Sequence, residues 1–104
     1  MLLVIGADRE PHGLDALGKR FGLEVEWIDG STRMIDKAER RIRAGSVSGI
    51  IVLDGYMPHR HFVPLLAASR ATGVPLAYGG RGGKGALGTA ADALAPGLAA
   101  RRVA

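Results

Sequence analysis

The chain contains no cysteine, and this absence excludes disulfides, thiol catalysis and thiolate metal sites. It also lacks any apolar run long enough to span a membrane. The first residues, Met1–Asp8, lead directly into an apolar segment without the basic leader of a signal peptide. We therefore expect a cytoplasmic protein that makes no membrane contact.

A strong charge excess is missing as well. The net charge is +4, from 14 Lys and Arg residues against 10 Asp and Glu residues. This mild excess permits contact with phosphate or acidic partners, but it is smaller than that of a dedicated nucleic-acid-binding protein. No internal repeat or linker divides the 104 residues, so we expect one domain over residues 1–104, with residues 98–104 as a frayed tail.

The segment Gly49–Pro58 carries the clearest structural signal. Ile50–Leu53 is an unbroken apolar run with three β-branched residues, which favours a strand over a helix. Because no polar residue alternates with them, both faces of this strand should be covered, as in the centre of a parallel sheet. Asp54 ends the run. In open α/β sheets the ligand meets the carboxyl ends of central strands, so Asp54 is expected at the binding edge.

Apolar strands alternate with amphipathic helices along the whole chain, which predicts a parallel sheet with right-handed crossovers. Asp8 is expected to cap the first helix with Pro11 in its first turn, and Pro96-Gly97 to stop or kink the last one. The expected strands cover residues 2–5, 23–29, 50–53 and 74–78, and the expected helices cover residues 11–21, 32–44, 61–72 and 87–94.

The fold class that follows is a small three-layer α/β fold, with an open parallel sheet of about four strands. Residues 23–29 alternate between apolar and polar side chains, so this strand belongs at a sheet edge and the strand order should be 2-1-3-4. The switch point then lies between the first and third strands. It should bring Gly6 and Asp8 opposite Asp54 and His59, and we expect these four residues to bind the ligand.

A glycine-rich segment, Gly79–Gly85, precedes the last helix. Glycines let successive N–H groups converge on an anion, and the helix dipole favours negative charge there. Arg81 and Lys84 add positive charge, so the expected ligand-binding residues of this loop are Gly80, Arg81, Gly82, Gly83 and Lys84. The loop is not a P-loop motif, because Gly85 follows Lys84 and no hydroxyl is placed for magnesium. A merely mobile glycine-rich loop is the alternative interpretation.

Asp54-Gly-Tyr-Met-Pro resembles the phosphoacceptor motif of two-component receiver domains, in which an Asp ends the third strand. The resemblance implies that Asp54 is phosphorylated in signalling. The chain departs from receivers because it has Gly6-Ala7-Asp8 in place of an acidic pair, Gly79 in place of a hydroxyl residue, and no fifth strand with its lysine. We therefore favour a structural Asp54 that accepts N–H bonds within its own loop, and keep the phosphoacceptor as an alternative.

The whole chain also resembles small bacterial Rossmann-like domains of unknown function. The shared features are Ile5-Gly6 at the end of the first strand, Pro58-His59 after the third, and the turn Gly79–Gly85 after the fourth. The resemblance implies a flavodoxin-like or receiver-like fold with a binding crevice, and it implies no activity.

No catalytic triad or paired carboxylate can be assembled from the pattern, and His59 and His61 lack an evident third metal ligand. We therefore expect no catalytic residues, metal or cofactor. The first hypothesis is a non-catalytic binding or regulatory domain for an anionic ligand, such as a nucleotide. A third hypothesis is nucleic-acid contact through the basic helix and Gly-rich loop. We also expect a homodimer held by the C-terminal region, including Leu94 and Leu98.

Overall fold

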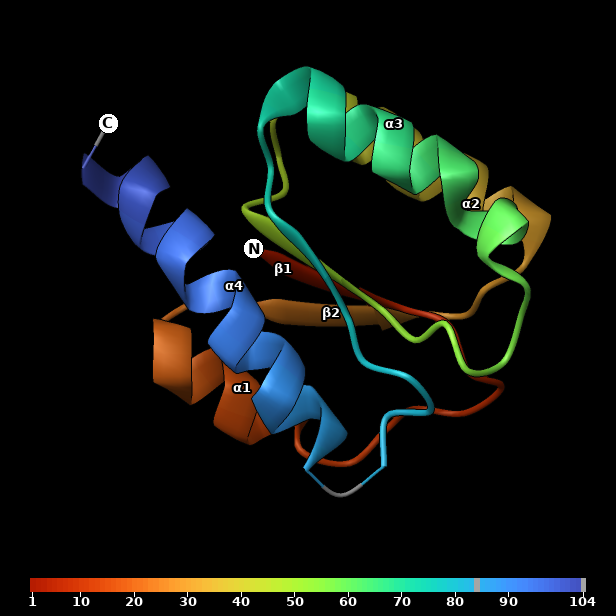
Figure 1. The fold of residues 1–104 in the computed structure, drawn as a ribbon, viewed down its shortest axis with the longest axis horizontal. Coiled ribbons are helices and arrows are strands. Elements are labelled where there is room, and N and C mark those ends of the chain that lie inside the picture. Colours follow the sequence, from red (N-terminus) through yellow and green to blue (C-terminus); the bar gives the residue numbers. More distant parts are fainter. Residues whose placement is uncertain (84, 104) are drawn as a thin grey trace.

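Four parallel strands form one sheet in the order β2-β1-β3-β4, which confirms the predicted α/β fold and strand order (Figure 1). The computed structural model describes residues 1–83 and 85–103. Lys84 therefore lies outside the described residues. The strands are β1 (Leu2–Ile5), β2 (Val25–Ile28), β3 (Gly49–Val52) and β4 (Leu76–Tyr78). The helices are α1 (Leu14–Phe21), α2 (Thr32–Arg43), the 3₁₀ helix η1 (His59–Phe62), α3 (Val63–Thr72) and α4 (Ala86–Val103).

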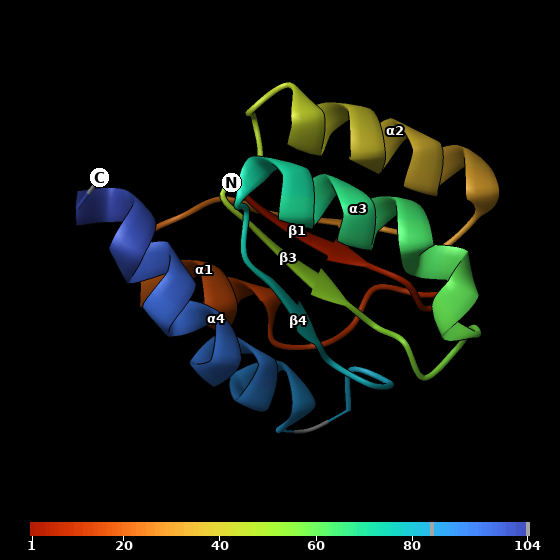
Figure 2. The ribbon, with the colours of Figure 1, turned by 45° about the horizontal axis from the view of Figure 1, so that its top comes forward.

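The helices cover both faces of the sheet, with α2 and α3 on one face and α1 and α4 on the other (Figures 1 and 2). Every residue of β1 is apolar because both faces of this strand are covered by helices. Leu3 and Ile5 pack in the core under α2 and α3, whereas Leu2 and Val4 pack in the core under α1 and α4. The strand β3 is buried on both faces in the same way, as expected for a central strand.

The strand β2 lies at the sheet edge, as its alternating sequence predicts. Val25 and Trp27 are half-buried, and Glu24 and Glu26 are exposed. The start of α2 was also correctly predicted, because the Ser31 hydroxyl accepts a hydrogen bond from the backbone N–H of Met34 at 3.3 Å.

The start of α1 was wrongly predicted. The helix begins at Leu14, so Asp8 does not cap it and Pro11 precedes it. Gly13 is the residue before the helix and adopts a left-handed backbone with φ of 93°. Its carbonyl accepts the N–H of Leu17, which fixes the first helical turn three residues later than the proline suggested.

The end of α4 was also wrongly predicted. The helix continues through Pro96 to Val103, beyond the expected end at residue 94, and Ala104 lies outside the described residues. Leu98 is buried in the core, and Gly97 lies against Pro75, where a β-carbon would come within 2.7 Å of the proline ring. The free energy gained by these contacts beyond the proline offsets the loss of the backbone hydrogen bond that Pro96 cannot make. In the described part of the chain, no helix has both the length and the hydropathy to cross a membrane.

Candidate functional site

Asp54 joins two loops at the carboxyl edge of the sheet. Its Oδ1 accepts a hydrogen bond from the Gly80 N–H at 3.0 Å, and its Oδ2 accepts one from His59 Nε2 at 2.8 Å. A third bond runs from the Gly55 N–H to the Gly80 carbonyl at 2.9 Å. The structure thus brings together three predicted site residues. The partner of Asp54 differs from the prediction, since Gly80 belongs to the loop after β4 and not to its own loop.

Two tyrosines that the sequence analysis did not single out complete this cluster. Tyr78 ends β4 and stacks on His59, with ring centroids 5.0 Å apart and an angle of 11° between the planes. Tyr56 donates its hydroxyl hydrogen to the Arg81 carbonyl at 2.7 Å and carries the Arg81 guanidinium over its ring. Tyr78 at the end of β4 and Tyr56 in the loop after β3, in a chain with two tyrosines, were the available signal.

At the expected crevice between β1 and β3, Gly6 packs closely against Leu53. Gly6 is buried there, with φ of 120°, and a β-carbon on it would lie 2.8 Å from the Leu53 carbonyl oxygen. The Gly6 carbonyl accepts a hydrogen bond from Trp27 Nε1 at 2.7 Å. Beside it, the Met57 side chain lies against Gly30. Gly6 therefore has a packing reason to be glycine.

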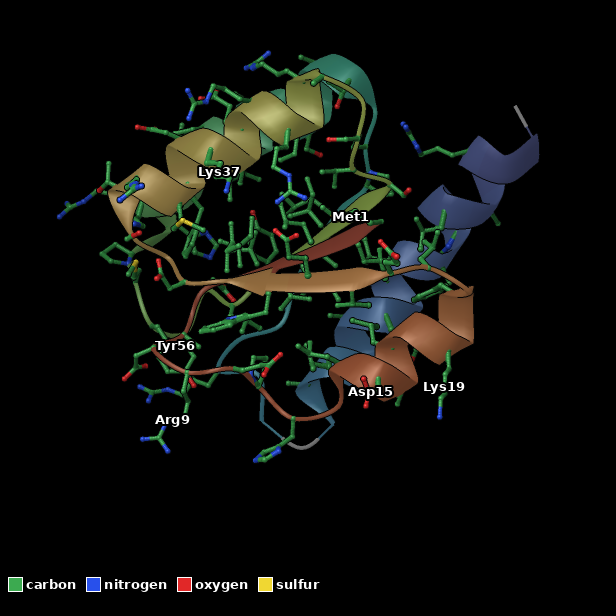
Figure 3. The ribbon with its side chains drawn as sticks, turned by 180° about the vertical axis from the view of Figure 1, so that it is seen from behind. Met1, Arg9, Asp15, Lys19, Lys37 and Tyr56 are labelled. Atoms are coloured by element: carbon green, nitrogen blue, oxygen red, sulfur yellow. The ribbon has the colours of Figure 1, made fainter. Side chains whose placement is uncertain are left out.

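Asp8, the remaining residue predicted at this crevice, is exposed on the loop after β1. No hydrogen bond or ion pair joins it to another described residue. Figure 3 shows Arg9, its neighbour, at the same end of the molecule as Tyr56. In the part of the chain that is described, no three His, Asp or Glu side chains are grouped to hold a metal ion.

A pocket of about 650 Å³ lies beside this edge, between α1, α4 and the Gly-rich loop. We call it the α1–α4 pocket. Both ribbon views show the two helices side by side (Figures 1 and 2). The predicted residues Gly82 and Gly83 line it, whereas Asp54 and His59 do not. The described residues of its wall are His12, Gly13, Ala16, Leu17, Arg20, Gly82, Gly83, Gly85, Leu87, Gly88 and Ala91.

Two helices begin at the mouth of the α1–α4 pocket. Gly13 precedes α1, and no side chain caps that helix. Gly85 precedes α4, and its carbonyl accepts the backbone N–H of Thr89 at 3.0 Å, so a glycine also stands at this N-cap. Neither glycine has a side-chain oxygen to accept a first-turn N–H. Both helix N-termini thus direct partial positive charge toward the same opening.

The polar side chains of the pocket wall lie at its two ends. His12 stands at the mouth and is exposed. Arg20, two turns along α1, pairs with Asp92 of α4, with 2.6 Å between Nη2 and Oδ1. The described wall includes no carboxylate, thiol or hydroxyl side chain. The titratable side chains of the described wall are thus His12 and Arg20, whereas the carboxylates of Asp15, in the first turn of α1, and Asp92 lie outside the wall.

His12, Gly13 and Arg20 were not predicted as pocket residues, because the sequence pattern placed the ligand at the switch point and the Gly-rich loop. The predicted helix start at Pro11 also left Gly13 unrecognised as the N-cap. We compared the chain with protein-family models, with curated proteins and with solved structures, and no match was found.

Proposed function

We propose that the protein is a non-catalytic binding domain that recognises a small anionic ligand at the mouth of the α1–α4 pocket. The observation that carries this proposal is the convergence of two glycine-capped helix N-termini and the Gly-rich loop on one opening. Helix N-termini are natural anion sites, because their N–H groups point outward and each helix contributes roughly half a positive charge.

The surrounding contacts support this location over the Asp54 side of the loop. The Gly80 N–H is already bonded to Asp54, and the Gly82 N–H is bonded to the Gly79 carbonyl at 2.9 Å. These bonds fix the loop, and the Ala86 N–H at the start of α4 is bonded to the Gly83 carbonyl at 2.9 Å. We place the ligand on the pocket side of the loop. His12 has no hydrogen-bond partner among the described residues and can donate to an anion there.

A charge placed at the mouth tests the proposal. Gly83 lines the pocket, its backbone φ is not in the left-handed region, and nothing lies within 4 Å of a β-carbon built on it. Gly83→Asp adds a carboxylate at the opening, and Gly83→Asn adds a neutral side chain of the same shape. Thermal-shift and calorimetric titrations would use inorganic phosphate and adenosine monophosphate (AMP) as probes.

We expect AMP and phosphate to raise the melting temperature of the wild type and of Gly83→Asn, but not of Gly83→Asp. If no anion shifts the wild type, or if both variants bind equally, the pocket mouth is not an anion site. The cytoplasmic location, the homodimer and nucleic-acid contact remain predictions from the sequence.

A further inference from the structure

The inner part of the α1–α4 pocket has a different chemistry from its mouth. Its walls are apolar, since Leu17 of α1 and Leu87 and Ala91 of α4 are buried at its floor. Ala16 lies on the same wall. An inorganic anion would leave this apolar space unused. A ligand that fills the pocket needs an uncharged, apolar body attached to its anionic group.

Gly88 keeps this inner space open. It stands in the first turns of α4, and nothing lies within 4 Å of a β-carbon built on it. The same position could hold alanine without a clash, and glycine is the less favourable helix residue. Packing against other described residues therefore does not explain the glycine. Its effect is to leave a flat, unobstructed wall opposite α1.

The far end of the pocket offers hydrogen bonds rather than net charge. The Asp92 carboxylate offsets the charge of Arg20, so the anionic group is drawn to the mouth and not to this end. A guanidinium carries five N–H donors, and the pair with Asp92 uses Nη2. Arg20 can thus donate a hydrogen bond to a ring nitrogen or ring carbonyl at this end, where its side chain is exposed.

We infer that the ligand of the α1–α4 pocket is a nucleoside monophosphate. Its base lies between α1 and α4 against Leu17, Leu87 and Gly88, its ring edge faces Arg20, and its phosphate lies at the mouth beside His12. This inference rests on the proposed function, and it adds the ring-binding half of the site. The pocket lies between the two helices, and its volume of about 650 Å³ falls within the range of small-molecule sites.

The test separates the two halves of the site. AMP, adenosine and inorganic phosphate would be titrated calorimetrically into the wild-type protein, into Gly88→Leu and into Ala93→Leu. Gly88→Leu fills the space between the two helices. Ala93→Leu adds the same bulk to an exposed position of α4 outside the pocket. Thermal unfolding without ligand checks that each variant is folded.

We expect the wild type to bind AMP about tenfold or more tightly than phosphate, because the ring adds apolar burial. Gly88→Leu should remove this advantage and leave phosphate binding unchanged, and Ala93→Leu should bind AMP as the wild type does. In NMR spectra AMP, but not phosphate, should shift the methyl signals of Leu17 and Leu87.

If the wild type binds AMP and phosphate with equal affinity, the ring site is wrong and the anion site stays in place. The same holds if Gly88→Leu prefers AMP over phosphate as strongly as the wild type does. Binding of AMP and adenosine without any binding of phosphate would support the ring site and refute the proposed anion site. If none of the three probes binds, both are overturned.

Discussion

Asp54 and Gly80 are 26 residues apart in the chain, and a hydrogen bond of 3.0 Å from the Gly80 N–H to the Asp54 carboxylate joins them. The bond connects the end of β3 to the loop after β4. That loop continues into Gly82 and Gly83 at the α1–α4 pocket. Asp54, which does not line the pocket, therefore holds the glycine-rich loop at Gly80.

Replacing Asp54 with alanine should loosen this loop. The variant loses the acceptor for Gly80 and for His59, and we expect the free energy of unfolding to fall by about 1–2 kcal/mol. Hydrogen exchange of the Gly80 amide should become faster, because its acceptor is gone. Urea unfolding and NMR-detected exchange would measure the two effects. Asp8→Ala removes an exposed carboxylate and is the matched control. Equal exchange of Gly80 in both variants would contradict the assigned role.

The hydrogen bonds of Asp54 also argue against its role as a phosphoacceptor. Both Asp54 oxygens accept hydrogen bonds, and a phosphoryl group on either oxygen would have to displace Gly80 or His59. We expect acetyl phosphate with magnesium to leave the intact mass of the protein unchanged. A mass increase of one phosphoryl group that disappears in Asp54→Ala would establish the receiver-like reading instead.

Gly6→Ala should destabilise the fold strongly. The new β-carbon would lie 2.8 Å from the Leu53 carbonyl oxygen, and φ of 120° is unfavourable for alanine. We expect the free energy of unfolding to fall by roughly 2–5 kcal/mol. Gly45→Ala separates the two causes, since Gly45 also has a positive φ, of 86°, but nothing near its β-carbon. That control should cost only about 1–2 kcal/mol. Similar urea midpoints for the two variants would show that the contact with Leu53 is unimportant.

The sheet could be predicted because burial leaves a local pattern in the sequence. Ile50–Leu53 is apolar at every position, and this pattern indicates a strand that is buried on both faces. Val25 and Trp27 alternate with glutamates, and this reports one covered face. Strand order then followed from placing the alternating strand at an edge.

The site could be predicted only in part, because its contacts depend on loop geometry. Glycine enrichment marked Gly82 and Gly83, but nothing local links Asp54 to Gly80. The α1–α4 pocket depends on where α1 begins. A proline suggested one start and the left-handed Gly13 set another. The length of α4 depended on the burial of Leu98, a tertiary contact that overrides the helix-breaking tendency of Pro96.

The pair of Glu26 and Arg41 should make stability depend on pH. The hydrogen bond from Arg41, followed by the charges of Arg41 and Lys37, lowers the pKa of the Glu26 carboxyl below its ordinary value of 4.5. A carboxyl whose pKa is lower in the folded state stabilises the fold above its unfolded pKa. That contribution is lost as the pH falls through the folded pKa.

Glu26→Gln should therefore lower the free energy of unfolding at neutral pH, by no more than about 1 kcal/mol because the side chain is half exposed. The difference from the wild type should shrink as the pH falls below 4.5. Urea unfolding at several pH values measures it. Glu24→Gln, at an exposed position two residues earlier, is the matched control for the loss of a carboxylate from this segment. A constant difference at all pH values would mean that Glu26 acts through packing.

The sequence suggested a homodimer held by the C-terminal region, yet Leu94 is fully buried and Leu98 is 4% exposed within the core of their own chain. Leu94→Ala should thus lower the free energy of unfolding by roughly 2–5 kcal/mol and leave the molar mass in light scattering unchanged. Ala93→Ser, at the exposed neighbouring position, should change neither quantity. If the protein is a dimer and Leu94→Ala yields a folded monomer, α4 is the interface after all. If the dimer persists, the exposed side chains of Tyr56, Val63 and Tyr78 are the surface to substitute next.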